Sequence, residues 1–320
     1  MRKIIALIVC FVYYGCNNSE EYDYRGKIPE SRLVIYAYME ADSLICAEIS
    51  KSRTYTDNSQ LDSTVDIKGQ VYLNDRYAGG LRSMGNFRYQ SDVRPQSGDK
   101  IMIKASYPEL EEVSATTVVC HPFPGIKLDT SRIGNTLYLR IHVNDEGGAV
   151  NYYRLVVENE TFIHGTQWND GQVQIGNSVH YTYDVDLSGD ELLSGEVIST
   201  IFGKEINANI YQVFTSEGFS GKEQILQASV GYPYSYKKET YYIEKGDTIR
   251  YLHEESHRLR VKVLRLDESL YYYLRTLGIY EKQPDMYKEP VQIFSNVQGG
   301  LGVVGSSFTR EITLEFPADK

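Results

Sequence analysis

The sequence predicts a mainly β protein: an N-terminal immunoglobulin-like β-sandwich, followed by a second antiparallel β domain with one short amphipathic helix. From residue 31 onward, short runs that alternate apolar and polar residues recur at close spacing, with Asn, Asp and Gly between them, as in sandwiches of antiparallel strands. The chain has 28 Tyr against one Trp, and tyrosine favours strands. Its 320 residues, 42% hydrophobic and 24% charged, are enough for two globular domains.

The first 15 residues have the layout of a secretory signal peptide. Two basic residues, at positions 2 and 3, precede an apolar run from Ile4 to Val12, which is too short to span a bilayer as a permanent helix. Gly15 followed by Cys16 resembles the cleavage box of bacterial lipoproteins, and the resemblance implies cleavage before Cys16 and lipidation of its thiol. An ordinary signal peptide or a short uncleaved anchor is the alternative.

The polar and acidic residues 16–27 resemble the tether of a surface-displayed lipoprotein. An acyl anchor fixes a protein to a membrane without a transmembrane helix. We therefore expect an outer-membrane protein that is held by a lipid and faces the cell exterior.

The cysteines allow two arrangements in the mature chain. Cys10 would leave with the signal peptide and Cys16 would carry the lipid, so that Cys46 and Cys120 remain. Both lie in runs that predict strands, and outside the cytoplasm they could form a disulfide. Two separately buried thiols are the alternative. Neither arrangement requires a catalytic cysteine.

Residues 28–120 are predicted to form the immunoglobulin-like sandwich, and residues 121–320 the second β-rich domain. "HPFPG", with two prolines, is predicted to link them. The expected strands of the first domain are "RLVIYAYME", "SLICAEISKS", "VDIKGQVYLN", "NFRYQSDV", "DKIMIKASY" and "EEVSATTVVC". Those of the second include "TLYLRIHV", "YYRLVVENE", "VHYTYDVDL", "EQILQASV", "HRLRVKVLRL" and "REITLEF".

One amphipathic helix is predicted near residues 268–277. Asp267 is a suitable N-cap and Gly278 a suitable stop. We expect this helix to pack on a sheet rather than to hold a cofactor. Its apolar face has the spacing i, i+3, i+4, i+7 and consists of Leu270, Tyr273, Leu274 and Leu277.

The segment "HEESH", residues 253–257, matches the zinc-protease pattern His-Glu-x-x-His. That chemistry requires a helix, which places both imidazoles on one face with the Glu beside the metal-bound water. Here a Gly-Asp turn at 246–247 and the alternation from residue 258 onward place the motif where two strands meet. We interpret it as a coincidence and predict no metal site, with His253 and His257 as candidates for adventitious binding only.

A second short pattern, "GLGVVG" at residues 300–305, spells the dinucleotide fingerprint. The fingerprint binds pyrophosphate only where it opens a helix, whereas the residues that follow alternate as a strand. We interpret its glycines as tight turns or close backbone packing.

The stretch "GYPYSY" is a candidate binding surface. Tyr232, Tyr234 and Tyr236 would share one face of a strand, and tyrosine suits contact surfaces that are partly wet. Ordinary sheet packing is the alternative, and Pro233 indicates an edge or loop position.

Two C-terminal segments, "DESLYYYLRTLGIY" and "DMYKEPVQIFSNVQGGLGVVG", resemble the closing signature of a Bacteroidota lipoprotein family catalogued as domain of unknown function forty-two forty-nine. The segments "ESRLVIYAYMEAD", "GNFRYQSDVRPQSGDKIMIKAS" and "EEVSATTVVCHPFP" resemble its opening domain. The resemblance spans nearly the whole mature chain. It implies an outer-membrane lipoprotein, often encoded beside a TonB-dependent receptor, and supplies no catalytic residues.

The preferred function is a non-enzymatic surface lipoprotein that acts as an accessory or ligand-binding partner of a TonB-dependent receptor in nutrient uptake, without a cofactor. A net charge of −10 and a pI near 5.2 argue against a nucleic-acid partner, which requires clustered Lys and Arg. One alternative is a peptidase or glycosidase on a β scaffold, with carboxylates such as Asp184, Asp186, Asp190 and Glu191. Another is an adhesion or envelope scaffold protein.

Overall fold

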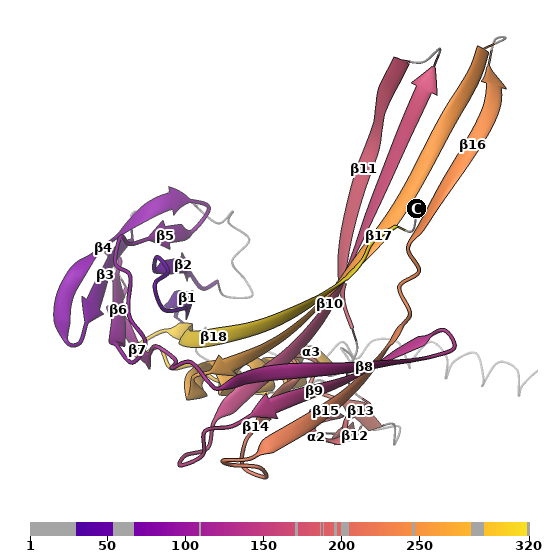
Figure 1. Ribbon diagram of the computed structural model, residues 1–320. Coiled ribbons are helices and arrows are strands. Elements are labelled where there is room, and N and C mark those ends of the chain that lie inside the picture. The colour runs from indigo at the N-terminus through magenta and orange to yellow at the C-terminus, as the bar shows by residue number, and fades with distance from the viewer. Residues whose placement is uncertain are drawn as a thin grey trace, which may run out of the picture.

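The computed structural model describes residues 30–53, 67–108, 110–169, 172–185, 187, 189–194, 197–199, 205–244, 247–282 and 291–318. Within these ranges the chain is mainly β, as predicted, with a large sheet rich in antiparallel pairs and smaller sheets beside it (Figure 1). The predicted signal peptide (1–15), the lipidation site Cys16 and the tether (16–27) lie outside the described residues. In the part that is described, no helix is long and apolar enough to cross a membrane.

Seven strands near the N-terminus enclose a first hydrophobic core. They are β1 (Leu33–Met39), β2 (Cys46–Lys51), β3 (Lys68–Leu73), β4 (Arg76–Gly85), β5 (Arg88–Gln90), β6 (Lys100–Ser106) and β7 (Val113–Val118). They pair in the order β1-β2-β5-β4-β3-β6-β7. Inward positions alternate along each strand, so that Ile35, Ile49, Ile101 and Ile103 are fully buried.

The remaining elements form a second β region. They are β8 (Gly125–Ile133), β9 (Thr136–Asn144), β10 (Tyr152–Asn169), β11 (Gln172–Asp184), α2 (Glu191–Ser194), β12 (Val197–Ser199), β13 (Glu205–Asn207), β14 (Val213–Thr215), β15 (Glu223–Gly231), β16 (Tyr236–Glu244), β17 (Asp247–Leu266), α3 (Glu268–Lys282) and β18 (Leu301–Phe316). A second core forms where the sheet β15-β9-β8 packs on the large sheet. There Leu139 and Ile141 of β9 join Leu155 of β10 and Val261 of β17, all at most 1% exposed.

The strand β18 connects the two cores. Its residues 301–306 pair in parallel with β1, and residues 307–316 pair antiparallel with β17. Val304 and Val297 lie in the first core. The predicted domain boundary at residue 120 does not account for these residues. Val297 and Val304, near the end of the chain, complete the core of the N-terminal strands.

The glycines of "GLGVVG" permit the close parallel pairing of β18 with β1. Gly302 has a φ of 104°, and a Cβ there would collide with the carbonyl oxygen of Ile35. The Asn296 side chain holds the same segment, because its oxygen accepts the Val304 N–H at 3.0 Å and its amide donates to the Val304 carbonyl at 2.8 Å. A strand therefore stands where the dinucleotide fingerprint requires a helix, and the interpretation as close backbone packing is confirmed.

The helix α3 begins as predicted but ends later. Asp267 caps it, because its carboxylate accepts the Leu270 N–H at 3.2 Å. The prediction that Gly278 stops the helix is wrong, since α3 continues to Lys282. A Cβ at this glycine would lie 2.5 Å from the carbonyl oxygen of Ala208. The glycine thus serves close packing of the helix on a neighbouring loop.

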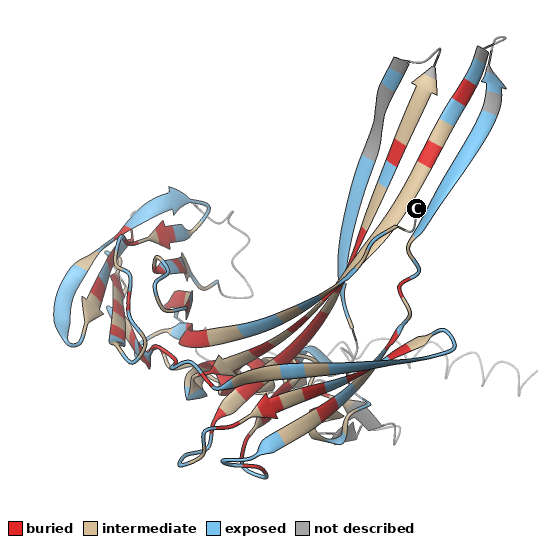
Figure 2. Cartoon of the chain, in the orientation of Figure 1, coloured by how far each residue is buried: buried red, intermediate tan, exposed pale blue. Residues whose placement is uncertain are grey.

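Strands β10 and β17 extend well beyond the second hydrophobic core. Their far halves pair with β11 and β16 and project away from the rest of the molecule as a four-stranded sheet (Figure 1). We call this sheet the arm; it comprises residues 162–169, 172–184, 236–244 and 247–256. Buried residues are concentrated in the body and scattered in the arm (Figure 2).

Candidate functional site

The far end of the arm carries a row of large side chains on one face. Val173, Trp168, Arg250 and Tyr241 occupy matching positions on β11, β10, β17 and β16, and residues in register point to the same face of a sheet. The Arg250 guanidinium lies 4.5 Å from the centre of the Trp168 ring. Ile243, two residues beyond Tyr241, is 78% exposed, and Tyr241 is 60% exposed. We call these five residues the end row.

Between the end row and the body, this face carries ion pairs beside the apolar side chains of Phe162 and Leu252, neither of which is exposed. Glu239 pairs with Arg250 in the arm. Nearer the body, Glu160 is only 7% exposed and contacts Arg258 at 3.3 Å and Arg260 at 3.1 Å. Cross-strand charge pairs stabilise a sheet and keep its face soluble, so the exposed apolar side chains of the end row stand out from their surroundings.

The "HEESH" segment lies inside β17, not at a junction of two strands as predicted, because β16 and β17 meet earlier, at Glu244 and Asp247. On an extended strand, His253 and His257 share a face but lie about 13 Å apart, whereas a helix would place them about 6 Å apart. The Glu that would serve as general base, Glu254, points to the opposite face and pairs with Lys237 at 2.7 Å.

Each of the two histidines has its own neighbours. His253 stacks on Tyr236, and the His257 Nδ1 lies 3.1 Å from the Thr161 hydroxyl. Glu255 lies between the two imidazoles, 3.2 Å from His257. No group of three or more His, Cys, Asp or Glu among the described residues is arranged to hold a metal ion. The zinc-protease geometry is therefore not present in this strand.

The prediction that the three candidate tyrosines share one face of a strand is wrong. Tyr232 and Tyr234 lie in the loop between β15 and β16, because the proline between them has no N–H for a strand ladder. Their rings meet edge to face at 5.0 Å, and Arg132 stacks on Tyr232 at 3.7 Å and donates to the Tyr234 hydroxyl at 2.7 Å. Tyr236 instead begins β16 and stacks on His253. The patch is thus two separate clusters.

Cys46 and Cys120, the cysteines within the described residues, are both free, so of the two arrangements left open the disulfide does not form. Cys46 is exposed and pairs in register with Gln90 on β5. Cys120 is buried beside Ser306 of β18, whose hydroxyl lies 3.2 Å from its sulfur. Burial raises the pKa of the Cys120 thiol to about 11. The alternative of two buried thiols is correct for Cys120 alone.

Asp145 is a buried carboxylate that follows β9, at the end of the body where β10 begins and away from the arm. It accepts hydrogen bonds from the Asn151 amide and the Tyr153 hydroxyl, both at 2.8 Å, and from the backbone N–H groups of Gly147 and Gly221 at 2.9 and 3.0 Å. Burial alone would raise its pKa, but these four hydrogen bonds outweigh burial and hold the pKa below its ordinary value. Its donors all belong to the fold, so this carboxylate is structural.

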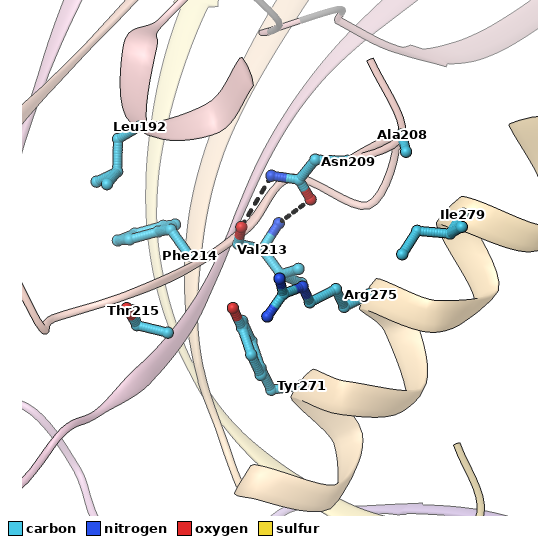
Figure 3. Close-up of a pocket in the computed structure, with 9 residues that line it drawn as sticks. All are labelled: Leu192, Ala208, Asn209, Val213, Phe214, Thr215, Tyr271, Arg275 and Ile279. Carbon is cyan, nitrogen blue, oxygen red and sulfur yellow. Dashed lines mark hydrogen bonds between the residues drawn. The ribbon is translucent and has the colours of Figure 1, made fainter. Parts of the chain in front are cut away.

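A pocket of about 250 Å³ lies between α3 and the segment that leads into β14 (Figure 3). From α3, Tyr271, Arg275 and Ile279 face it, one helical turn apart. Sequence analysis assigned these three helix residues no role, because the opposite wall of the pocket comes from residues 56 or more positions away. That wall consists of Leu192, Ala208, Asn209, Val213, Phe214 and Thr215.

Comparisons with known proteins place these features in context. A family model described as a domain of unknown function, DUF4249, matches residues 19–313. A search of curated proteins gives no match. Among solved structures, a crystal structure of Parabacteroides merdae β-glucuronidase is similar at 12% identity and a TM-score of 0.20, over 74% of this chain and 24% of that one. The chain thus spans about a quarter of that protein, and a TM-score this low supports no inference about fold or activity.

Proposed function

The chain belongs to the DUF4249 family, and from this premise we propose that it is a non-enzymatic outer-membrane lipoprotein that binds a TonB-dependent receptor or a ligand bound for one. Lipidation of Cys16 would hold it on the membrane, facing the exterior, and the acidic tether would separate the folded part from the lipid. Receptor binding would make it an accessory to nutrient uptake.

The observation that carries this proposal is the arm with its end row. Aromatic side chains and arginine are enriched at the centres of protein interfaces, and Trp168, Arg250 and Tyr241 supply both on adjacent strands. The arm projects beyond both cores, so these side chains add little to the packing of the chain itself. A surface of this kind is suited to contact with a second protein.

The experiment is purification of the tagged, lipidated chain from gently solubilised outer membranes, followed by mass spectrometry of bound proteins. A double variant, Tyr241→Ser with Ile243→Ser, removes the two most exposed members of the end row. The matched control, Tyr77→Ser with Ile133→Ser, removes side chains of the same types that are 61% and 68% exposed outside the arm. We expect a stoichiometric receptor barrel with the wild type and the control, and its loss with the arm variant.

Two outcomes contradict the proposal. Retention of the barrel by the arm variant would exclude the end row as the docking surface. Absence of any barrel from the wild-type preparation would favour a free-standing binder or a hydrolase. A hydrolase would then be recognised by turnover of a peptide or glycan that one carboxylate substitution abolishes.

A further inference from the structure

The pocket beside α3 is held open by contacts within the fold. Gly278 lets the helix approach the carbonyl of Ala208. The Asn209 amide donates to the carbonyls of Leu193 and Val213 at 3.1 and 2.8 Å, and its oxygen accepts the Val213 N–H at 2.9 Å. These bonds fix the loop that forms one wall of the pocket. A pre-formed site binds with a smaller loss of conformational entropy than one that must be ordered.

The lining of the pocket combines one positive charge with apolar walls. Of the nine described residues that line it, Arg275 alone is charged, in a chain whose net charge is −10. Figure 3 shows its guanidinium and the Tyr271 hydroxyl turned toward the same space. Val213, Phe214 and Ile279 supply apolar surface around that space. A guanidinium presents paired N–H donors that match the two oxygens of a carboxylate.

The volume restricts the ligand to a small molecule. About 250 Å³ lies just below the range of about 300–1,000 Å³ that is usual for drug-sized ligands. A carboxylate with a short aliphatic chain or a single aromatic ring fits this size. Its charged group would meet the guanidinium, and its apolar part would meet the apolar walls.

We propose that this pocket binds a small organic anion, a monocarboxylate with an apolar body, with Arg275 and Tyr271 at the carboxylate and Phe214 and Ile279 against the apolar part. The pocket is separate from the arm, so the proposal stands whether or not the arm binds a receptor. It adds a ligand site within the chain itself.

The first test uses the purified full-length chain in detergent, with sodium benzoate and sodium hexanoate as probes. Binding is followed by ligand-observed NMR and isothermal titration, with benzamide and hexanamide as neutral analogues of the same shape. We expect saturable binding of at least one carboxylate, about tenfold or more tighter than its amide, because hydrogen bonds to a charged group are the stronger ones. Absence of saturable binding, or equal affinity for acid and amide, would overturn the proposal.

The second test changes the guanidinium. Arg275→Gln should weaken carboxylate binding about tenfold or more, and Arg275→Lys should give an intermediate affinity, since lysine keeps the charge but loses the paired donors. Arg76→Gln, at an exposed position of β4, is the control and should bind as the wild type does. Unchanged binding by a folded Arg275→Gln would show that the site lies elsewhere. The comparison of acid and amide needs no variant, so it decides the matter even if the substitution impairs folding.

Discussion

Strands β10 and β17 pair in one continuous register over residues 152–169 and 249–266, yet their two halves lie in different surroundings. In the half within the body, Leu155 and Val261 are fully buried between β9 and the large sheet. In the arm, Ile163 occupies the same face of β10 eight residues later and is only partly buried. The backbone ladder is the same in both halves, whereas the side-chain packing is not.

This difference shows that the pairing of backbone groups and the burial of apolar side chains are separate requirements of a β protein. Paired backbone groups are enough to extend a sheet beyond its core, because their hydrogen bonds are satisfied within the sheet. Stability comes mainly from buried apolar area, which the halves within the body supply. The arm is therefore free to carry side chains for contact with other molecules, and the following substitutions test that separation.

The largest effect is expected from Leu155→Ala. Because the side chain is fully buried, its loss should lower the free energy of unfolding by about 2–5 kcal/mol. The matched change in the arm, Ile163→Ala, should cost at most about half as much, since its neighbours can relax into solvent. Chemical denaturation of both variants measures the difference, and equal costs would mean that the arm and the core unfold as one unit.

A smaller effect is expected from the ion pairs along the other face. Glu160→Gln leaves two arginines without their shared, nearly buried carboxylate and should cost about 1.5–3 kcal/mol, the range for hydrogen bonds to charged groups. Glu239→Gln removes the exposed pair with Arg250 and should cost less than about 1 kcal/mol. Thermal unfolding at low and high salt measures both losses. A loss for Glu239→Gln as large as that for Glu160→Gln would show that burial does not decide the strength of these pairs.

The buried carboxylate of Asp145, in the body, provides a pH-dependent test. Asp145→Asn should cost about 1–2 kcal/mol at pH 7, because an amide cannot accept all four hydrogen bonds of the carboxylate. The folded-state pKa of Asp145 is lowered, so the contribution of the ionised form is complete above the unfolded-state pKa of about 3.9 and is lost as the pH falls through the folded-state value. The stability gap between wild type and variant should therefore narrow in acid. A gap that widened below pH 4 would contradict this assignment.

The smallest effect on stability is expected at the end row. Tyr241→Ser with Ile243→Ser should change the free energy of unfolding by less than about 0.5 kcal/mol, since both side chains are well exposed. The same variant should lose partner binding. A large loss of stability would mean that the end row packs within the chain and is not a surface for docking.

The strands that bury one face could be predicted from the sequence, because period-two alternation records a buried face directly. Leu137, Leu139, Ile141 and Val143 alternate in "TLYLRIHV" and are all at most 5% exposed. The start of α3 was equally predictable, since its cap is local. Its end was not, because Gly278 is explained by a contact with Ala208, 70 positions earlier.

The arm and the pocket could not be predicted, since both depend on contacts between distant segments. The polar "HEESH" residues show no alternation, so their place inside β17 follows only from the register with β10. The pocket joins α3 to residues near position 210, and nothing local in either segment signals the other. Only the one-turn spacing of Tyr271, Arg275 and Ile279 was visible, and it equally fits ordinary helix packing.

The pairing of β18 with β1 sets an order in which the chain can fold. Val304 and Val297 enter a core otherwise built before residue 120, and β1 has β18 as its partner on one edge. During synthesis, the edge of β1 therefore stays unpaired until some 180 further residues have been made. Contacts of such long sequence separation form late and slowly. A chain cut short before residue 301 would keep an open β edge, the kind of surface at which chains aggregate.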